Sequence, residues 1–431
     1  MSHVVTRFAP SPTGLLHAGN YRTAVFAYLF AKHHGGDFVL RIEDTDRERS
    51  KPEYEKNILG ALEWLSLPYD TFYRQSEHVS QHRALLARLI DEGKAYISPE
   101  APREGGGRAE VIRFKNLGGI VSFTDMIRGE ISMDVGDLKD FVIARSLDEP
   151  VFHFAVVADD AAAGITHVVR GEDHIPNTPR QILIQRALGL PTPHYAHLPL
   201  ILGADRSKLS KRRGARALTD YRDMGFLPHA MLNYLAFLGW NPGDEREYLS
   251  REELIFAFDL ARVHKGSAIF DEVKLRSVNQ YWMRSLPDEE FLVQGNFEAT
   301  LLPVVSLLKE RASTFAEARE LLAGELRCLF ERPILEKERL LAKEPLVGKT
   351  KEYLDSSVAR IEASIEGTTT PEVVKGVLMP YAEQEGRGAV LWPLRYALSG
   401  QERSPDPFTL VAILGKEEAL ARLRSALGIL G

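Results

Sequence analysis

The pattern of hydrophobic and polar positions at the start of the chain predicts a strand, a helix and a second strand. Residues 4–8 predict a short strand, and residues 19–33 carry apolar side chains at the spacing of one helix face. Gly35 and Gly36 end this helix, and residues 38–42, rich in branched and aromatic side chains, predict the second strand. This order predicts a parallel sheet whose ligands bind at the carboxyl ends of the strands.

A second group of elements follows much later in the chain. Residues 166–170 and 196–202 predict two more strands, and Asn177, Thr178 and Pro179 predict a helix start between them. The sheet is therefore expected to be split in sequence by an inserted region, about residues 75–155. The centre of that region, residues 99–113, has the glycine-rich pattern of a loop.

Beyond about residue 285 the pattern becomes helical and charged, and it contains few good strand candidates. Residues 315–330 and 416–427 are examples of the helical segments. We therefore expect a separate α-helical domain at this end of the chain.

Composition and charge narrow the class of protein. The chain has 431 residues, 44% of them hydrophobic, which predicts several domains. A net charge of −6 argues against nonspecific coating of nucleic acid, so any nucleic-acid contact must be a local patch. The single cysteine, Cys328, excludes an internal disulfide and a cysteine-based zinc site. Without an apolar N-terminal core or a run of about 18 apolar residues, we expect a cytoplasmic protein that makes no membrane contact.

Residues 11–20 place hydroxyl groups, glycines and an imidazole between the first strand and the helix. Backbone N–H groups and the helix dipole favour phosphate at such a position. The glycines permit close approach, and His17 can donate a hydrogen bond to a phosphoryl oxygen as charge develops. A tight turn with a surface histidine would give the same pattern, so this segment alone leaves both interpretations open.

Residues 206–216 contain six cationic side chains and no acidic one. Lys208 and Lys211 suit a mobile point-charge role on phosphoryl groups, whereas an arginine gives a fixed fork. Taken alone, the run is better interpreted as a solvated basic loop or an RNA-backbone patch. Its pairing with the segment about 190 residues earlier favours a shared phosphate site.

Together the two segments resemble the ATP-binding elements of class I aminoacyl-tRNA synthetases. Residues 17–20, His-Ala-Gly-Asn, resemble the His-Ile-Gly-His element, and residues 208–212, Lys-Leu-Ser-Lys-Arg, resemble the Lys-Met-Ser-Lys-Ser element. The chain is similar, more narrowly, to the bacterial glutamyl-tRNA synthetases. The stretches that carry this likeness are residues 7–14, 41–46, 165–174 and 232–235, with a weaker likeness in the tail at residues 393–395 and 414–417.

The resemblance implies an α/β fold with a Rossmann-like parallel sheet split by an inserted α+β domain. The expected segments are residues 1–75 and 156–204 as two halves of the catalytic domain, 76–155 as the inserted acceptor-binding (connective) domain, 205–285 as the phosphate loop and an all-α stem-contact region, and 286–431 as an α-helical anticodon-binding domain. The implied reaction is ATP-dependent activation of L-glutamate to glutamyl-adenylate and transfer to the 3′ end of tRNA(Glu), releasing AMP and pyrophosphate.

For glutamate, the resemblance implies that Glu43 receives the α-ammonium group, while Arg7 and Arg170 face the side-chain carboxylate. Physical chemistry agrees, because a buried pocket for one cation and two carboxylates must offer an acid and more than one cation. The implied glutamate-binding residues are Arg7, Ala9, Ser11, Glu43, Phe152, Val156 and Arg170. Structural ion pairs, Glu43 with Arg41 or Arg47 and Arg170 with Glu172, are the alternative interpretations.

For ATP, the resemblance implies that His17, Lys208 and Lys211 are the catalytic residues. The implied ATP-binding residues are Thr13, His17, Gly19, Asn20, Asp173, Ile201, Lys208, Ser210 and Lys211. Such transfers depend on positioning and charge stabilisation, so Mg²⁺ is expected to accompany ATP and no general base is required. Some relatives bind zinc in the inserted region, but residues 96–113 contain no cysteine, and we expect no zinc and no protein-held metal.

Two departures from the family pattern affect these expectations. Asn20 replaces the second histidine of the class-wide element, as it commonly does in the glutamyl branch. Phe152 stands where many relatives carry a tyrosine whose hydroxyl can contact the substrate carboxylate. The phenylalanine puts one polar contact in doubt.

The expected partners are tRNA of the glutamate isoacceptors, L-glutamate and ATP, and we expect a monomer. Basic residues after the phosphate loop, Arg212, Arg213 and Arg216, are candidates for tRNA contact. A glutaminyl enzyme, a glutamyl enzyme that also charges tRNA(Gln) and a non-catalytic RNA-binding paralogue remain open. A base-modifying paralogue or a small nucleotidylyltransferase would not explain the long helical tail.

Overall fold

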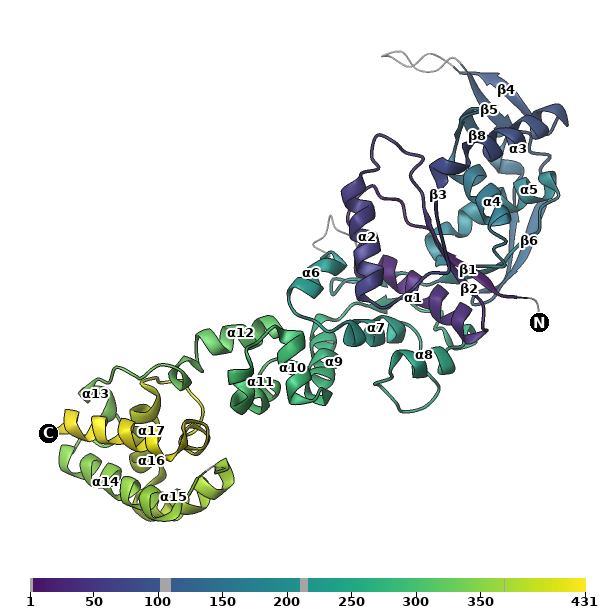
Figure 1. Cartoon of the computed structure of the whole chain (residues 1–431). Helices are drawn as coiled ribbons and strands as arrows, with labels where there is room; N and C mark the ends of the chain where they lie inside the picture. Colours follow the sequence, from purple (N-terminus) through teal and green to yellow (C-terminus); the bar gives the residue numbers. More distant parts are fainter. Residues whose placement is uncertain (1–2, 101–109, 210–215, 368) are drawn as a thin grey trace. The chain divides into compact units, whose positions relative to one another are not determined.

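The structure is a computed structural model that describes residues 3–100, 110–209, 216–367 and 369–431. It contains two compact units, Met1–Trp282 and Met283–Gly431, and their boundary falls within helix α9 (Glu272–Ser285). Figure 1 shows strands and helices in the first unit and helices in the second. The smaller divisions expected within the first unit stay a prediction.

A parallel sheet forms the start of the first unit. Strands β1 (Val5–Phe8), β2 (Asp37–Ile42) and β3 (Thr71–Arg74) pair in that order, and helix α1 (Ala18–His33) connects the first two. Every residue of α1 from Ala24 to Ala31 is buried, so the helix is packed on all sides and not only on the face predicted from the sequence. The predicted β-α-β unit is confirmed.

The second part of the sheet comes from residues more than a hundred positions later. Strands β10 (His167–Gly171) and β11 (His194–Leu198) are parallel and are connected by helix α5 (Thr178–Leu188). The backbone N–H of Thr166 donates to Val5 O at 3.0 Å, which places β10 beside β1. The expectation of a parallel sheet split in sequence is confirmed.

The inserted region contains an antiparallel sheet, in the order β4 (Ala95–Pro99), β5 (Glu110–Phe114), β8 (Phe141–Ser146) and β9 (Glu149–Pro150), with helix α3 (Val79–Asp91) packed against β4. The loop predicted for residues 99–113 is wrong at both ends, because Pro99 and residues 110–113 belong to strands. Residues 101–109 lie outside the described residues. Ile112 and Phe114 are buried in β5, and this alternation outweighs the nearby glycines.

The inserted region also contributes to the split parallel sheet. Strand β6 (Ile120–Asp125) forms a hairpin with β7 (Gly129–Asp134) and pairs with β11, where Tyr195 is in register with Asp125. Sequence patterns did not predict this connection. This pairing places Asp125 beside β11, in the same sheet as β10 and β11.

The single strand predicted for residues 196–202 is wrong. β11 ends at Leu198, and a separate short strand, β12 (Ile201–Leu202), follows after Pro199, which has no N–H to donate to a ladder. β12 pairs in parallel with β13 (Ala268–Ile269), so the region after residue 205 is not entirely helical. Its helices are α6 (Leu218–Asp223), α7 (Pro228–Phe237), α8 (Arg251–Ala257) and α9.

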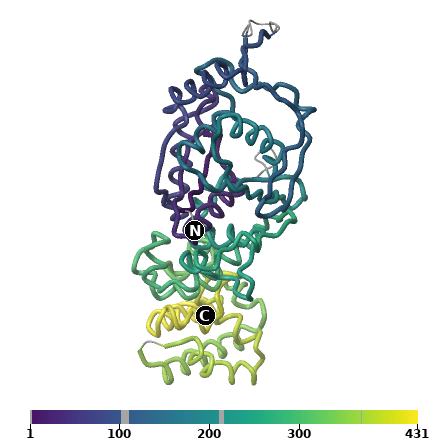
Figure 2. Tube along the Cα trace, turned by 90° about the vertical axis from the view of Figure 1, so that its right-hand side faces the viewer, coloured from purple at the N-terminus to yellow at the C-terminus, as the bar shows by residue number. Residues whose placement is uncertain are grey.

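In the second unit the described residues form helices and no strand. The longer ones are α14 (Val347–Ser364), α15 (Pro371–Glu385), α16 (Arg387–Ser399) and α17 (Pro407–Leu430), and Figures 1 and 2 show α17, in yellow, among the others. Leu354, Leu394 and Leu410 belong to their shared buried core. The helical domain is confirmed, but the helix predicted for residues 315–330 is broken, since α12 (Phe315–Ala323) ends at Gly324.

Within the described residues no single helix is long and apolar enough to cross a membrane. Two consecutive helical segments, Asp288–Gly295 and Ala299–Arg311, are together long and apolar enough for a span, but the chain bends by 120° between them.

Candidate active site

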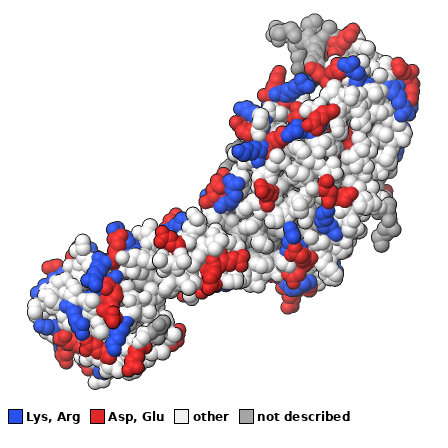
Figure 3. Space-filling view, in the orientation of Figure 1, with Lys and Arg blue, Asp and Glu red and all other residues white. Residues whose placement is uncertain are grey.

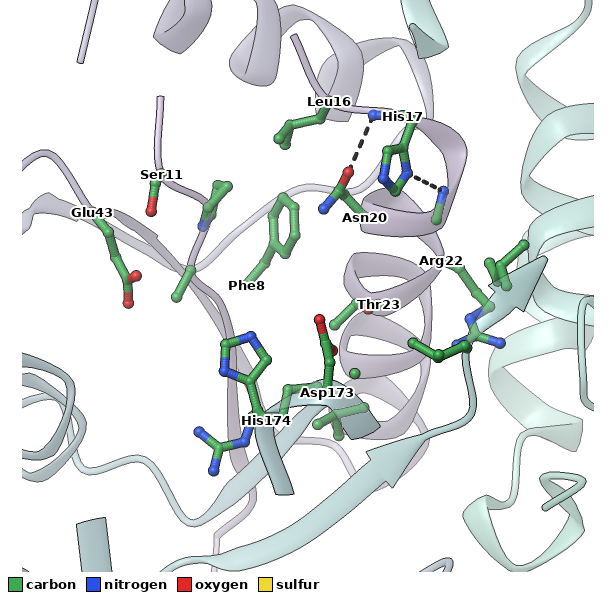
Figure 4. Close-up of a pocket in the computed structure, with 18 of the residues that line it drawn as sticks. Phe8, Ser11, Leu16, His17, Asn20, Arg22, Thr23, Glu43, Asp173 and His174 are labelled. Atoms are coloured by element: carbon green, nitrogen blue, oxygen red, sulfur yellow. Dashed lines mark hydrogen bonds between the residues drawn. The ribbon is translucent and has the colours of Figure 1, made fainter. Parts of the chain in front are cut away.

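A cavity of about 430 Å³ opens where β1, β2 and β10 end and α1 begins. Figure 4 shows Ser11 and Glu43 on one side, His17 and Asn20 at the start of α1, and Asp173 with His174 below them in this view. All the predicted glutamate-binding residues line this cavity: Arg7, Ala9, Ser11, Glu43, Phe152, Val156 and Arg170. So do seven predicted ATP-binding residues: Thr13, His17, Gly19, Asn20, Asp173, Ile201 and Lys208. Ser210 and Lys211 lie outside the described residues.

His17 is the N-cap of α1. Its Nδ1 accepts a hydrogen bond from the backbone N–H of Gly19 at 3.1 Å, and its own N–H donates to Oδ1 of Asn20 at 3.1 Å (Figure 4). Because Nδ1 accepts, the hydrogen of a neutral His17 ring is on Nε2. The cap therefore fixes which ring nitrogen can donate, and it gives Asn20 a capping role that sequence reasoning missed.

Gly19 leaves room for the His17 ring. A Cβ atom added at this position would lie 3.0 Å from Cε1 and Nδ1 of His17 and 3.6 Å from Cδ1 of Ile201. A side chain here would push the imidazole away from the helix start. The glycine therefore has two roles: it leaves space for the His17 ring, and it permits close approach of a ligand.

Lys208 and Asp173 meet across the cavity. The Nζ atom of Lys208 lies 2.8 Å from Oδ2 of Asp173, and both side chains are about half exposed. A partly exposed pair of this kind contributes little stability, roughly 0–1 kcal/mol. Lys208 is thus held over the cavity by an ion pair that a stronger anion can replace.

Arg7 and Glu43 belong to a buried ionic network. Nε of Arg7 lies 3.3 Å from Oδ1 of Asp160. Arg41 contacts both carboxylates: its Nη1 lies 2.5 Å from Oδ1 of Asp160, and its Nη2 lies 3.0 Å from Oε1 of Glu43. Burial raises the pKa of Glu43, and Arg41 opposes that rise. The alternative pairing of Glu43 with Arg41 is therefore present, but the carboxylate still faces the cavity.

Arg170 is 6% exposed and has different partners. Its Nε donates to Nε2 of His197 at 3.1 Å, and its Nη2 donates to Oγ1 of Thr178 at 2.7 Å. Among the described residues no carboxylate lies within ion-pair distance of Arg170. The alternative pairing with Glu172 is wrong, because that side chain pairs with Arg128.

Burial lowers the pKa of Arg170 to about 10, so the guanidinium stays charged at neutral pH. A buried cation without an anionic partner is costly. Arg170 also lines the cavity, so an anionic group of a ligand can reach it.

Sequence reasoning missed three contributors to the site. Asp160, fully buried on helix α4 (Phe152–Ala162), supports both Arg7 and Arg41. Arg22 reaches from α1 to the carbonyl oxygens of Pro199 and Leu238. His174 lines the cavity, and burial together with the Arg170 charge lowers its pKa to about 4. An acidic pair, residues 159–160, inside an otherwise apolar helix was the available sequence signal for Asp160.

Comparison with known proteins identifies the family. A model described as the catalytic domain of class I tRNA synthetases (E and Q) matches residues 3–105 and 100–277, and an anticodon-binding-domain model matches residues 275–427. The chain belongs to the class I tRNA synthetase family. This synthetase is therefore an enzyme with the predicted fold class, and its family implies ATP, an amino acid and tRNA as reactants.

Individual relatives resemble the synthetase along its whole length. A glutamate–tRNA ligase from Oleidesulfovibrio alaskensis is 42% identical and one from Aquifex aeolicus is 40% identical, with 99% and 98% of each chain covered. The crystal structure of a glutamate tRNA ligase from Elizabethkingia meningosepticum in complex with its amino acid has a TM-score of 0.87 at 32% identity and covers both chains fully.

The candidate tRNA contacts of the synthetase are only partly described. Arg212 and Arg213 lie outside the described residues, and Arg216 has a half-exposed side chain 3.6 Å from Glu272. Figure 3 shows Lys and Arg interspersed with Asp and Glu on the visible face of each unit. This distribution agrees with local rather than general contact with nucleic acid.

The described residues of the synthetase contain no group of three or more His, Cys, Asp or Glu side chains that could hold a metal ion. Cys328 is buried in the second unit. The expectation that no zinc is bound stays a prediction.

Proposed function

We propose that this synthetase is a glutamate–tRNA ligase, which activates L-glutamate with ATP and transfers it to the 3′ end of tRNA(Glu). The observation that carries the proposal is the buried guanidinium of Arg170, which lines the cavity without a carboxylate partner among the described residues. A carboxylate on the substrate side chain meets this requirement. An amide does not.

The charge around Arg7 and Glu43 favours the same substrate. Among the described residues, the charged side chains that line this end of the cavity, or form ion pairs with those that do, are Arg7, Arg41, Arg170, Glu43 and Asp160. Three are cations and two are anions, and the next carboxylate, Asp125, reaches Arg170 only through the ring of His197. The charged groups at the cavity itself therefore carry one positive charge in excess. Glutamate carries a net negative charge and balances it, whereas glutamine is neutral overall and leaves it unbalanced.

In the proposed complex, Glu43 receives the α-ammonium group, and Arg7 and Arg170 face the side-chain carboxylate. Arg41 then holds Glu43 in place, and Asp160 holds Arg7 in place, each through an ion pair. The remaining proposed contacts to glutamate come from Ala9, Ser11, Phe152 and Val156, which line the cavity.

In the proposed first step, an oxygen of the glutamate α-carboxylate attacks the α-phosphorus of ATP, and the bond between that phosphorus and the leaving pyrophosphate breaks. Nε2–H of His17 donates to a phosphoryl oxygen, and Lys208 exchanges Asp173 for phosphate. Lys211 and Ser210 would assist from outside the described residues. Mg²⁺ would arrive with ATP and neutralise phosphate charge.

The other proposed ATP contacts surround the start of α1. Thr13, Gly19 and Asn20 lie beside the phosphates, and Asp173 and Ile201 lie beside the ribose and adenine. In the second step a hydroxyl of the terminal tRNA ribose attacks the adenylate carbonyl, which releases AMP.

Replacing Phe152 with tyrosine is expected to lower the KM for glutamate by about threefold to tenfold. Phe152 lines the cavity and is 37% exposed, so an added hydroxyl would be open to a ligand there, and we expect it to contact the substrate carboxylate. Steady-state charging with varied glutamate measures the effect, and Phe152→Leu serves as the control that adds no hydroxyl. A KM unchanged by the tyrosine would show that this position does not face the carboxylate.

A charging assay tests the proposed function. Purified protein is incubated with ATP, labelled glutamate and either tRNA(Glu) or tRNA(Gln), and acid-precipitable label is counted. We expect label on tRNA(Glu) and release of AMP and pyrophosphate. Label on both tRNAs would identify the non-discriminating alternative, and no label on either would support the non-catalytic one and refute the proposal.

A further inference from the structure

A hydrogen-bonded chain of three side chains leads from the inserted region to the cavity. Oδ2 of Asp125 lies 2.6 Å from Nδ1 of His197, and Nε2 of His197 lies 3.1 Å from Nε of Arg170. Asp125 and His197 are 2% and 0% exposed, so water does not compete for these contacts. Asp125 is on β6, His197 on β11 and Arg170 on β10. These three strands are neighbours in one sheet, in the order β10, β11, β6.

The protonation state of this chain follows from its donors. A guanidinium nitrogen can only donate, so Nε2 of His197 must accept, and the hydrogen of the neutral ring is on Nδ1, facing Asp125. Asp125 is held in turn by the backbone N–H groups of Ile127 and Arg128 at 3.0 and 2.8 Å. Burial, with the Arg170 charge, lowers the pKa of His197, in agreement with a neutral ring.

These contacts fix the plane of the Arg170 guanidinium. Nε points to His197, and Nη2 points to Thr178, whose hydroxyl lies 3.2 Å from the carbonyl oxygen of His174. Among the described residues Nη1 has no hydrogen-bond acceptor, and Arg170 lines the cavity. The planar fork therefore presents its remaining donors to a ligand in one orientation.

We infer that His197 is a positioning residue for the substrate carboxylate, and that Asp125 fixes the tautomer of its ring. His197 does not line the cavity, and its Nε2 contacts Arg170 and the hydroxyl of Thr178, which itself contacts Arg170. This inference rests on the proposed function, because it assigns the recognition of the glutamate side chain to Arg170. It also gives the hairpin β6–β7 of the inserted region a role in amino-acid selection.

Two amide variants separate the contact of Nδ1 with Asp125 from the contacts of Nε2 with Arg170 and Thr178. The amide of His197→Gln reaches the position of Nε2 and can accept from Arg170, whereas the amide of His197→Asn reaches only the position of Nδ1 and can donate to Asp125. We expect His197→Asn to raise the KM for glutamate by about tenfold or more, since a charged hydrogen bond is lost. His197→Gln should stay within about threefold of the wild type, and the KM for ATP should change less than twofold in both.

The wild type and both variants are compared by tRNA charging with varied glutamate and then with varied ATP. Equal KM values for glutamate in His197→Asn and the wild type would overturn the inference and leave the proposed function intact. A parallel rise in the KM for ATP would assign His197 a general structural role and would also overturn it. A wild type that does not charge glutamate would overturn both proposals.

Asp125→Asn provides a second route if His197→Asn does not fold. Its amide can donate or accept, so the ring of His197 is no longer restricted to one tautomer, and the KM for glutamate is expected to rise by about threefold to tenfold. An unchanged KM in this variant would also contradict the inference.

Discussion

Replacing Arg170 with alanine is expected to lower kcat/KM for glutamate by between about 10²- and 10⁴-fold. The substrate carboxylate would enter a buried site without its cation, and breaking a buried ion pair costs about 3–5 kcal/mol, while about 1.4 kcal/mol corresponds to a tenfold change in rate. The loss should be large because Arg170 is 6% exposed and water cannot replace it. Steady-state charging with varied glutamate measures it.

Two further variants make this result specific. Arg170→Lys keeps the charge but loses the planar fork held by His197 and Thr178, so its kcat/KM should lie between those of the alanine variant and the wild type. Arg83→Ala removes an exposed arginine that pairs with Asp148, and it should leave kcat/KM within about twofold of the wild type. Normal kinetics in Arg170→Ala would remove the basis for glutamate recognition in this cavity.

Replacing His17 with asparagine is expected to lower kcat by about 10²- to 10³-fold while the KM for glutamate stays close to that of the wild type. The imidazole Nε2–H is lost, and with it a donor to the phosphoryl oxygens. Asparagine is a good N-cap and can still accept from the backbone N–H of Gly19, so the start of α1 is preserved. Single-turnover charging with saturating ATP and glutamate measures the chemical loss.

His17→Ala separates catalysis from helix capping. It should lose kcat to the same extent as the asparagine variant, but it should also lower the free energy of unfolding by about 1 kcal/mol, because the cap to Gly19 is removed. Chemical denaturation of both variants tests the second effect. If His17→Asn retained wild-type kcat, the imidazole would have only the capping role.

The sequence predicted the first β-α-β unit because each of its elements has a clear local pattern. β1, α1 and β2 begin within one residue of their predicted positions, and the glycines after α1 end it as expected. The break of residues 196–202 into two strands has a local cause, Pro199, that the run of apolar residues concealed. The pairing of β6 with β11 had no local cause to detect, since the two strands lie far apart along the chain.

In the site, too, the sequence predicted residues that follow local patterns and missed residues whose contacts are distant along the chain. The residues expected around ATP and glutamate gather at one cavity because they follow strands whose carboxyl ends meet. Asp160 and His197 were missed, because their partners are distant in sequence and burial alone makes them important. For Arg170, the neighbour at position 172 suggested an ion pair, but β10 ends at Gly171 and Glu172 pairs with Arg128.

We propose that an unbalanced positive charge in the cavity selects a substrate with a side-chain carboxylate. The most direct test of this proposal is the ratio of kcat/KM for glutamate to kcat/KM for glutamine, measured with the wild-type protein and the same tRNA(Glu). We expect a ratio of at least about 10³, because glutamine leaves Arg170 buried and unpaired. Comparable charging with both amino acids, or charging with glutamine alone, would contradict it.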